Sequence, residues 1–587
     1  MSPVSRAVVA AACALVACGH PGRVHEDRPP PHAQKGAFTL SIVGTNDLHG
    51  ALDRLPLLTG YISNLRAARA ADGGAVLLVD AGDLFQGTLE SNIGEGADVV
   101  RAYNQMGYVA SAVGNHEFDF GPAGPATTAK SVEEDPRGAL KERAREARFP
   151  FLVSNINDAQ SHARIKWPNM PASTLVEIGG VKVGIVGAST AATPYTTMPA
   201  NFLGLEMAPT ATAIADEARA LRTKGAQVIV VVAHIGSSCK DLDHPLDTSS
   251  CDHAEELFGL VDELPKGLID VIVAGHTHAA IAHRISGIAV IESYSSGRAF
   301  GRIDLRVSAD GHVAASRILR TQLICPLGAG GNALPVADCH PDAYEGKPVV
   351  ADPDVQAIVD SALAKAGARR NEKLGVTLAG PITKAHGEES SEGDWFCDLM
   401  LAARPDAQVA VTNGGGLRAD IPAGDLLYGQ LFEAMPFDNR FAIVDVQGKH
   451  LRKMVSGNLQ HGGAILSWGG LAAHAKCGKE GRLDLQITVG GKPLDEAATY
   501  KIATSDFLAS GGDGLIGRLK LPAGSIHETD VIIRDALADV LRAKQGTVDP
   551  AKILSQTKRR MDYVGSRPVS CGGAGPGSGS ATQQEPD

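Results

Sequence analysis

The chain has 587 residues with a formal net charge of −11 at pH 7, and 44 % of the residues are hydrophobic. This apolar content is enough for more than one globular core, so two domains are expected. Because the overall charge is negative, no global basic field exists to hold a nucleic-acid polymer or an anionic membrane surface. A small anion is not excluded, since bound metal ions reverse the local field.

The first 18 residues are typical of a secretory signal. Arg6 supplies one positive charge, and the apolar stretch after it is too short to span a bilayer as a mature helix. The sequence LVAC, ending at Cys18, resembles a bacterial lipobox, in which the cysteine becomes the lipidated first residue; an ordinary cleaved signal is the alternative. Residues 19–36 contain three consecutive prolines and predict an extended tether. We therefore expect an exported protein of the periplasm or cell envelope, attached to a membrane only through lipid at Cys18.

Seven cysteines follow this leader, and export makes disulfides permissible. The favoured pairs, each closing a loop of about a dozen residues, are Cys239 with Cys251 and Cys325 with Cys339. The remaining three, Cys397, Cys477 and Cys571, leave one odd thiol. No cysteine belongs to a CxxC pair, so the spacing does not indicate a zinc–thiolate site.

From residue 38 to about 320, short apolar runs alternate with helical or polar segments. The runs are FTLSIVG, AVLLVDAGD, VASAVGN, FPFLVSN, VKVGIVGA, QVIVVVAH, DVIVAGH and IAVIES. Such runs, without alternation of polar residues, predict strands buried on both faces in a layered α/β domain. Helical patterns at 53–70 and 210–224 fall between them.

The pattern changes at 321–350, which is a Cys-, Gly- and Pro-rich loop. Residues 352–370 then have apolar positions at helical spacing, an acidic start with Pro353 and a basic end, which predicts a helix bridging two domains. A second, mixed α/β domain and a disordered Gly-rich tail follow. The predicted organisation is signal 1–18, tether 19–36, first domain 37–345, interdomain helix 346–372, second domain 373–563 and tail 564–587.

Five of the predicted strands are each followed by a turn that carries acidic, amide or imidazole groups. These turns hold Asp47 and His49; Asp83; Asn115, His116 and Asp119; His234; and His276 with His278. In open α/β folds, ligands collect at the carboxyl ends of strands, so the five turns can converge on one crevice. A lone strand-end histidine is more often a satisfied polar group than a ligand, but five such turns in chain order indicate a metal site.

The residue types indicate the chemistry. Imidazole, carboxylate and amide ligands without thiolate suit Mn, Zn, Fe, Co or Mg and do not select among them. Two divalent ions need a bridging carboxylate, and Asp83 stands between an Asp/His pair and an Asn/His set. A dinuclear site lowers the pKa of bound water and clamps the oxygens of a tetrahedral phosphoryl centre. The residue types therefore predict a site for two divalent metal ions that can activate water and clamp a phosphoryl centre.

The series DxH, GD, GNHE, H and GHxH resembles the calcineurin-like metallophosphatase superfamily, and FQG and NHEFD resemble its 5′-nucleotidase branch. The resemblance implies a four-layer α/β/β/α metallophosphatase domain. It implies that one metal is held by Asp47, His49, Asp83 and His278, and the other by Asp83, Asn115, His234 and His276. It also implies a catalytic dyad of His116 and Asp119, in which the imidazole stabilises or protonates the leaving oxygen and the carboxylate orients it.

Three loops of the second half carry candidate substrate-binding residues. TNGGGLR contains Asn413 and Arg418, MPFDN contains Phe437, and DFLASGGDG contains Phe507 and Asp513. Taken singly, Gly-rich turns are usually only turns and Phe is usually core. Their joint order resembles the 5′-nucleotidase carboxy-terminal domain. That resemblance implies that Asn413 and Arg418 bind near phosphate or ribose, Phe437 and Phe507 stack on the base, and Asp513 holds the sugar.

One segment departs from the family pattern. KAHGEESSEGDWFCDLM has His386 and Glu388 at the positions that align with arginine, and Gly393-Asp394-Trp395 replaces a Gly-Asn-Leu word. Fewer cations would then face the substrate phosphate, so the preference among nucleotides stays open.

Taken together, the resemblance implies an exported two-domain enzyme that hydrolyses 5′-nucleotides, AMP-like or di- and triphosphates or UDP-sugars, to nucleoside and phosphate by metal-hydroxide attack. The domains of this family rotate, with the bridging helix as the hinge. The alternatives on the same scaffold are a 2′,3′-cyclic nucleotide phosphodiesterase and a sulfur-ester hydrolase. An inactive surface binding protein is the alternative from another class, but every proposed ligand position holds a coordinating side chain. No nucleic-acid polymer is expected as a partner, and the sequence does not predict an oligomeric state.

Overall fold

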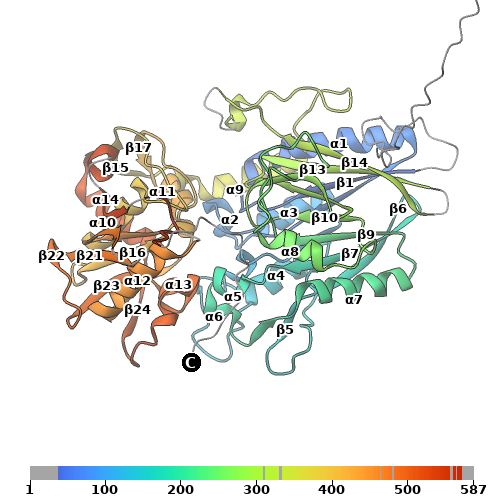
Figure 1. Ribbon diagram of the computed structural model, residues 1–587. Helices are drawn as coiled ribbons and strands as arrows, with labels where there is room; N and C mark the ends of the chain where they lie inside the picture. The colour runs from blue at the N-terminus through green and yellow to red at the C-terminus, as the bar shows by residue number, and fades with distance from the viewer. Residues whose placement is uncertain are drawn as a thin grey trace, which may run out of the picture.

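The structure is a computed structural model that describes residues 38–308, 311–328, 334–462, 465–478, 482–555, 559–563 and 565–571. The predicted signal, Cys18 and the tether lie outside the described residues. The described chain forms two α/β domains with a long helix between them (Figure 1). Within these ranges, no helix combines the length and hydrophobicity needed to cross a bilayer.

Two six-stranded sheets form the centre of the first domain. The first sheet has the order β14 (Val313–Leu323), β13 (Ala299–Val307), β1 (Phe38–Thr45), β2 (Ala75–Asp80), β3 (Ala110–Ala112) and β4 (Phe151–Leu152). The second has the order β11 (Ala280–Ile285), β12 (Ile288–Ser293), β10 (Val271–Ala274), β9 (Val228–His234), β7 (Val181–Ser189) and β6 (Ser173–Ile178). A two-stranded ribbon pairs β5 (Ile156–Asp158) with β8 (Leu205–Met207).

The two sheets pack face to face, with helices on both outer sides. Because side chains alternate along a strand, Ile42 of β1 joins Val230 of β9 in the core between the sheets, whereas Val43 points to the outer helices. The helices of this domain are α1 (Leu55–Asp72), α2 (Leu89–Asn92), α3 (Ala97–Met106), α4 (Gly138–Glu146), α5 (Thr193–Thr196), α6 (Pro199–Phe202), α7 (Thr210–Thr223) and α8 (Glu256–Glu263). The cores under α1 and α3 on one side and under α7 and α8 on the other complete four layers. The predicted α/β/β/α arrangement is confirmed.

The predicted elements are present. All eight apolar runs contain strands (β1, β2, β3, β4, β7, β9, β10 and β12), although β3 and β4 are only three and two residues long. The two helical patterns correspond to α1 and α7. Strands β13 and β14, which were not among the predicted runs, extend the first sheet by antiparallel pairing onto β1.

The predicted bridging helix is α9 (Pro353–Arg370). Asp352 caps it by accepting hydrogen bonds from the backbone N–H groups of Asp354 and Val355, both at 3.0 Å. Val355 packs into a core of the first domain, while Ala366 near the other end packs into a core of the second. One helix therefore contributes to both domains. The domain limits given above stay a prediction.

The second domain contains three smaller sheets. They are β17 (Gly424–Leu427), β15 (Lys373–Leu378) and β25 (Gly546–Val548); β19 (Leu466–Gly469), β16 (Val409–Asn413), β23 (Thr499–Ser505), β18 (Arg440–Gln447) and β24 (Ile526–Ile532); and β22 (Lys492–Pro493), β21 (Leu483–Val489), β20 (Leu471–Cys477) and β26 (Met561–Tyr563). Its helices are α10 (Ser391–Ala403), α11 (Tyr428–Ala434), α12 (Gly448–Gln460), α13 (Asp506–Ala509), α14 (Ile533–Lys544) and α15 (Pro550–Ile553).

Residues 565–571, which the sequence analysis placed in the predicted tail, lie against the second domain. The backbone N–H of Val569 donates to the carbonyl of Leu459 at 2.8 Å, and Cys571 forms a disulfide with Cys477, 94 positions away. Local composition could not indicate this covalent link between distant residues. Residues 572–587 lie outside the described residues.

The disulfides include both predicted pairs, and the structure identifies which of the three remaining cysteines is unpaired. Both favoured short-range pairs, Cys239–Cys251 and Cys325–Cys339, are present. Among the described cysteines, the one left free is Cys397, which is buried.

We expect Cys571→Ser to lower the free energy of unfolding of the second domain by about 2–4 kcal/mol, because a bridge that closes a long loop restricts the unfolded chain. Urea denaturation under non-reducing conditions measures the effect. Ser570→Ala, at the exposed neighbouring position, is the matched control and should leave the free energy unchanged. Equal unfolding of Cys571→Ser and the unmodified protein would contradict a stabilising bridge.

Candidate metal centre and substrate cavity

The five predicted metal-binding turns meet at the carboxyl ends of five strands. Strands β1, β2 and β3 run parallel in the first sheet, and β9 and β10 run parallel in the second. Because the two sheets are stacked, their carboxyl ends lie at one edge of the domain. The side chains in these turns form two adjoining clusters.

The first cluster joins Asp47, His49 and His278. The Nε2 atoms of His49 and His278 are 2.9 Å apart, and His278 Nε2 is 3.3 Å from Asp47 Oδ1. These three residues form a group whose ligand atoms could hold one metal ion.

The second cluster surrounds His234. Its Nε2 lies 3.1 Å from Asp83 Oδ2, 3.0 Å from Asn115 Oδ1 and 3.2 Å from His276 Nδ1. Asp83 adjoins both clusters, since the same Oδ2 atom is 3.8 Å from His49 Nε2. The arrangement therefore brings together all seven residues predicted as ligands.

The backbone at this centre is strained. Positive φ angles, which non-glycine residues rarely adopt, occur at Asp47 (51°), His49 (50°), Asp83 (60°), His276 (85°) and His278 (58°). Such conformations cost of order 1–3 kcal/mol each and cluster at functional sites. Gly114 packs closely against Asp83, because any other residue at this position would place its Cβ 2.1 Å from Asp83 Oδ1. The sequence carried no signal for these backbone angles.

Burial and mutual charge shift the pKa values of the cluster strongly. Burial raises the pKa of Asp83, but His234 and His116 outweigh it and hold that pKa well below its ordinary value. Burial lowers the pKa of His234, yet the Asp83 carboxylate raises it to about 10. For His276, burial and the neighbouring His234 lower the pKa to about 3. Cations bound here would displace the His234 proton, because metal ligands bind in their deprotonated form.

The residues fit divalent metal ions. Asp47 Oδ1 is buried and accepts no hydrogen bond among the described residues, so a negative oxygen faces the cluster without a donor. The facing ring nitrogens of His49 and His278 add lone pairs at the same place. Carboxylate, imidazole and amide donors of this kind suit Mn, Zn, Fe, Co or Mg and do not distinguish them.

The predicted dyad is formed beside the second cluster. His116 Nδ1 lies 2.5 Å from Asp119 Oδ2, and the other carboxylate oxygen of Asp119 accepts a hydrogen bond from Thr197 Oγ1 at 2.9 Å. Burial lowers the pKa of His116, but the carboxylates of Asp119 and Asp83 outweigh burial, so the pKa is raised. His116 Nε2 lies 4.0 Å from Asp83 Oδ2, so the imidazole is next to the clusters.

Two further residues support the ligands and were missed by the sequence analysis. Asn46 Nδ2 donates to Asp47 Oδ2 at 2.7 Å. The buried carboxyl group of Glu117 accepts hydrogen bonds from the backbone N–H groups of Asp83 (2.9 Å) and Gly114 (2.6 Å), which ties two metal-site turns together. Glu117 lies within the NHEFD word, so its position was visible, but its backbone partners depend on the fold.

A cavity of about 940 Å³ opens between the two domains at this centre. The predicted residues that line it are Asp83, Asn115, His116, Asp119, His276, His278, Asn413, Arg418, Phe437, Phe507 and Asp513. The other three, Asp47, His49 and His234, are buried behind the lining. The volume is in the range of sites for small organic ligands.

Arg418 belongs to the second domain, and its side chain contacts candidate metal ligands of the first domain. One of its terminal nitrogens lies 3.1 Å from His49 Nε2 and 3.4 Å from His278 Nε2. The Phe437 ring lies nearby, with its centroid 5.7 Å from the Arg418 guanidinium carbon and 5.3 Å from the centroid of the His116 ring. A cation and an aromatic ring of the second domain therefore face the clusters of the first.

The other substrate-binding candidates lie in the second-domain wall of the cavity. Asn413 Nδ2 donates to Asp513 Oδ2 at 2.6 Å, so these two predicted residues contact each other. Of the two positions that depart from the family pattern, His386 lines the cavity, while Glu388 lines a separate pocket. Burial, together with Lys384 and Arg418, lowers the pKa of His386, so this side chain supplies no cation at neutral pH.

The fold and this centre define a class of enzyme, the calcineurin-like phosphoesterases, and residues 40–280 match that family. Residues 371–519 match the family described as 5′-nucleotidase, C-terminal domain. The chain therefore belongs to the 5′-nucleotidases of the calcineurin-like phosphoesterase class, as predicted, and it is a metal-dependent hydrolase.

Individual relatives agree with this assignment. The chain is 26 % identical over 513 residues to protein UshA of Yersinia enterocolitica, covering 81 % of this chain and 86 % of UshA. It is 26 % identical over 543 residues to the 5′-nucleotidase of Homo sapiens, covering 82 % and 84 %. The crystal structure of a 5′-nucleotidase precursor from Thermus thermophilus has the same fold, with a TM-score of 0.69, 23 % identity and coverage of 90 % and 99 %.

Proposed function

We propose that this protein hydrolyses the 5′-phosphoester of nucleotides, releasing a nucleoside and inorganic phosphate. The observation that carries the proposal is the contact of Arg418 with His49 and His278, because it brings a phosphate-binding cation against the candidate metal ligands. The cavity also offers aromatic rings for a base and a carboxylate for a ribose.

In this proposal Asp47, His49, Asp83 and His278 hold one divalent cation, and Asp83, Asn115, His234 and His276 hold the other. When bound, such a pair lowers the pKa of a water molecule and neutralises charge on the phosphoryl oxygens.

The protein's own groups bind the substrate and move one proton. Arg418 donates to the phosphoryl oxygens. Asp119 holds His116 through Nδ1, which leaves Nε2 to protonate the leaving 5′-oxygen. Phe437 and Phe507 stack on the base, Asp513 accepts hydrogen bonds from the ribose, and Asn413 orients Asp513.

Incubation with AMP, ATP, 2′,3′-cyclic AMP or a UDP-sugar, with Mn²⁺ and with a chelator, tests this function when released phosphate and the nucleotide and nucleoside products are both measured. Chelator-sensitive release from AMP with adenosine as the co-product would support it. Turnover of 2′,3′-cyclic AMP alone would reassign the enzyme as a phosphodiesterase. Metal-loaded protein that turns over no nucleotide would overturn the proposed substrate class, with a sulfur ester as the next substrate to assay.

Arg418→Lys keeps the positive charge but removes the bidentate fork. We expect kcat/KM for AMP to fall roughly 10- to 100-fold, because hydrogen bonds to a charged group contribute about 1.5–3 kcal/mol. Steady-state kinetics measure the change. Arg404→Lys, at an arginine paired with Asp406 away from the cavity, is the control and should not change kcat/KM. Unchanged kcat/KM in Arg418→Lys would argue against phosphate binding by this side chain.

Asp119→Asn tests the protonation state of His116 through the pH–rate profile. A raised pKa keeps an imidazole acid protonated to higher pH, and its activity is lost as the pH rises through that pKa. Since Asp119 raises the His116 pKa, we expect Asp119→Asn to move the alkaline limb of kcat to lower pH. Thr197→Val removes only the hydroxyl that donates to Asp119 and should shift the limb less. An unmoved limb in Asp119→Asn would show that this carboxylate does not tune the acid.

We further propose that the enzyme is exported and lipidated at Cys18. The signal-like residues 1–18 and the three disulfides support export, because disulfides persist in oxidising compartments. Mass spectrometry of the mature amino-terminal peptide tests it, with Cys18→Ala as the control. If the mature protein began at another residue and carried no lipid, the proposed lipid anchor would be wrong, whereas the proposed export would stand.

A further inference from the structure

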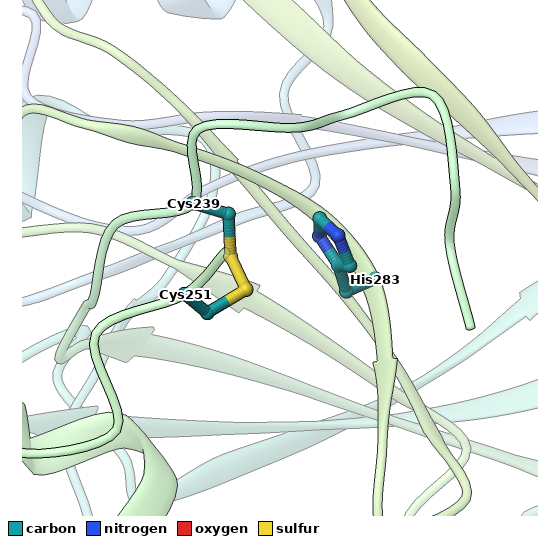
Figure 2. A group of neighbouring side chains, drawn as sticks. All are labelled: Cys239, Cys251 and His283. Atoms are coloured by element: carbon teal, nitrogen blue, oxygen red, sulfur yellow. A yellow bond between two sulfur atoms is a disulfide. The ribbon is translucent and has the colours of Figure 1, made fainter. Parts of the chain in front are cut away.

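A second group of metal-ligating side chains lies outside the catalytic cavity. Cys239, Cys251 and His283 bring two sulfurs and a ring nitrogen within 4.8 Å of one another. The sulfurs form a disulfide, and the His283 ring stands beside it (Figure 2). The sequence did not indicate such a group, because the cysteines are 12 residues apart and His283 lies on β11.

His283 is buried without a full set of partners. Its side chain is 0 % exposed, and its Nε2 atom has no hydrogen-bond partner among the described residues. Leaving a buried polar atom unsatisfied costs free energy, so such an atom calls for an explanation in the function or in a ligand. Cys251 beside it is only partly buried, which leaves this side of the disulfide accessible to a reductant.

The backbone holds the cysteines together independently of the sulfur–sulfur bond. Cys239 and Cys251 face each other across an antiparallel bridge. Asp252 N–H donates to the carbonyl of Ser238 at 2.8 Å, and Cys239 N–H donates to the carbonyl of Ala280 at 3.2 Å, at the start of the strand that carries His283. Two thiols produced by reduction would therefore stay beside the imidazole.

We propose that reduction of Cys239–Cys251 by an external dithiol creates a binding site for one Zn²⁺-like divalent cation, with Cys239, Cys251 and His283 as ligands. Two electrons and two protons from the dithiol cleave the disulfide to two thiols, and the dithiol becomes a disulfide. The two thiols release their protons as the thiolates bind the cation. Two thiolates and one imidazole are a ligand set of zinc sites, and water completes the tetrahedron. The cation then closes the 239–251 loop in place of the covalent bond.

Cobalt absorption and thiol alkylation of the full-length protein test this site. After treatment with dithiothreitol and its removal, we expect added Co²⁺ to give a sulfur-to-metal charge-transfer band, which the catalytic centre cannot give because it has no thiolate ligand. We also expect Zn²⁺ to slow alkylation of Cys239 and Cys251 by roughly tenfold or more. Peptide mass spectrometry locates the label, and the oxidised protein should show neither signal.

The other cysteines and two variants provide the controls. Alkylation of Cys325 and Cys339, a pair of similar loop length, should not respond to Zn²⁺. His283→Gln should reduce protection of the two site cysteines, and the double variant Cys239→Ser/Cys251→Ser should abolish the cobalt band. Three results would each overturn the proposal. Zn²⁺ could protect both cysteine pairs equally, the cobalt band could persist in the double variant, or Zn²⁺ could leave the alkylation rate of Cys239 and Cys251 unchanged.

Discussion

Replacing Asp83 with asparagine is expected to reduce the rate of nucleotide hydrolysis by more than about 10³-fold. This loss is larger than the loss expected from removing one hydrogen-bond donor that stabilises a transition state. Asp83 Oδ2 lies 3.1 Å from His234 Nε2 and 3.8 Å from His49 Nε2, so this oxygen adjoins both clusters. An amide keeps the size of the side chain and removes its charge. The variant should therefore lose metal as well as activity, and its residual rate should match that of the chelated enzyme.

Metal content and thermal stability separate this effect from misfolding. Asp80→Asn is the matched control, because Asp80 is also fully buried at the end of β2 but accepts hydrogen bonds from Thr45 Oγ1 and Tyr103. We expect Asp80→Asn to lower the melting temperature and to retain metal. Full metal content with full activity in Asp83→Asn would refute a bridging role for Asp83.

Replacing His116 with asparagine should lower kcat for AMP by roughly 10²- to 10⁴-fold while changing KM little, as expected for loss of a general acid. The deficit should be smaller for 4-nitrophenyl phosphate, whose leaving group needs no proton. If His116 had a purely structural role, its replacement would lower kcat equally for both substrates. The ratio of the two kcat values therefore distinguishes acid catalysis from support of the fold.

Metal analysis again provides the control for this variant. The His116 backbone N–H donates to Asp83 Oδ1 at 2.9 Å, a contact that a side-chain substitution leaves in place. We therefore expect His116→Asn to retain its metal ions. Equal losses for both substrates, with metal retained, would contradict the proton-donor role.

Much of the first domain could be predicted because its signals are local. A strand buried on both faces needs consecutive apolar residues, as in β9, and the amphipathic spacing of α7 follows from its helical period. The ligand types Asp47, Asn115 and His234 are likewise visible directly after or at the end of those runs. The helix over 353–370 was predictable from Pro353 and its apolar spacing.

Contacts between distant residues could not be predicted in the same way. The pairing of Cys477 with Cys571 spans 94 positions, and composition alone suggested that the segment around Cys571 was disordered. The support of Asp83 by Glu117 and the separation of His386 from Glu388 also depend on packing. A local pattern specifies an element, but it does not specify which turns of two elements face each other.

The sequence by itself determined the layered α/β fold of the first domain and the residue types of the candidate metal centre, because apolar periodicity and side-chain chemistry are properties of short segments. The family followed from the resemblance of its short motifs to those of known 5′-nucleotidases. Only the tertiary structure decided that five candidate ligands adopt positive φ, that Arg418 of the second domain contacts two of them, and that His283 meets Cys239 and Cys251. The physical reason is that these relations are set by how sheets and domains pack, which brings together residues that no local pattern connects.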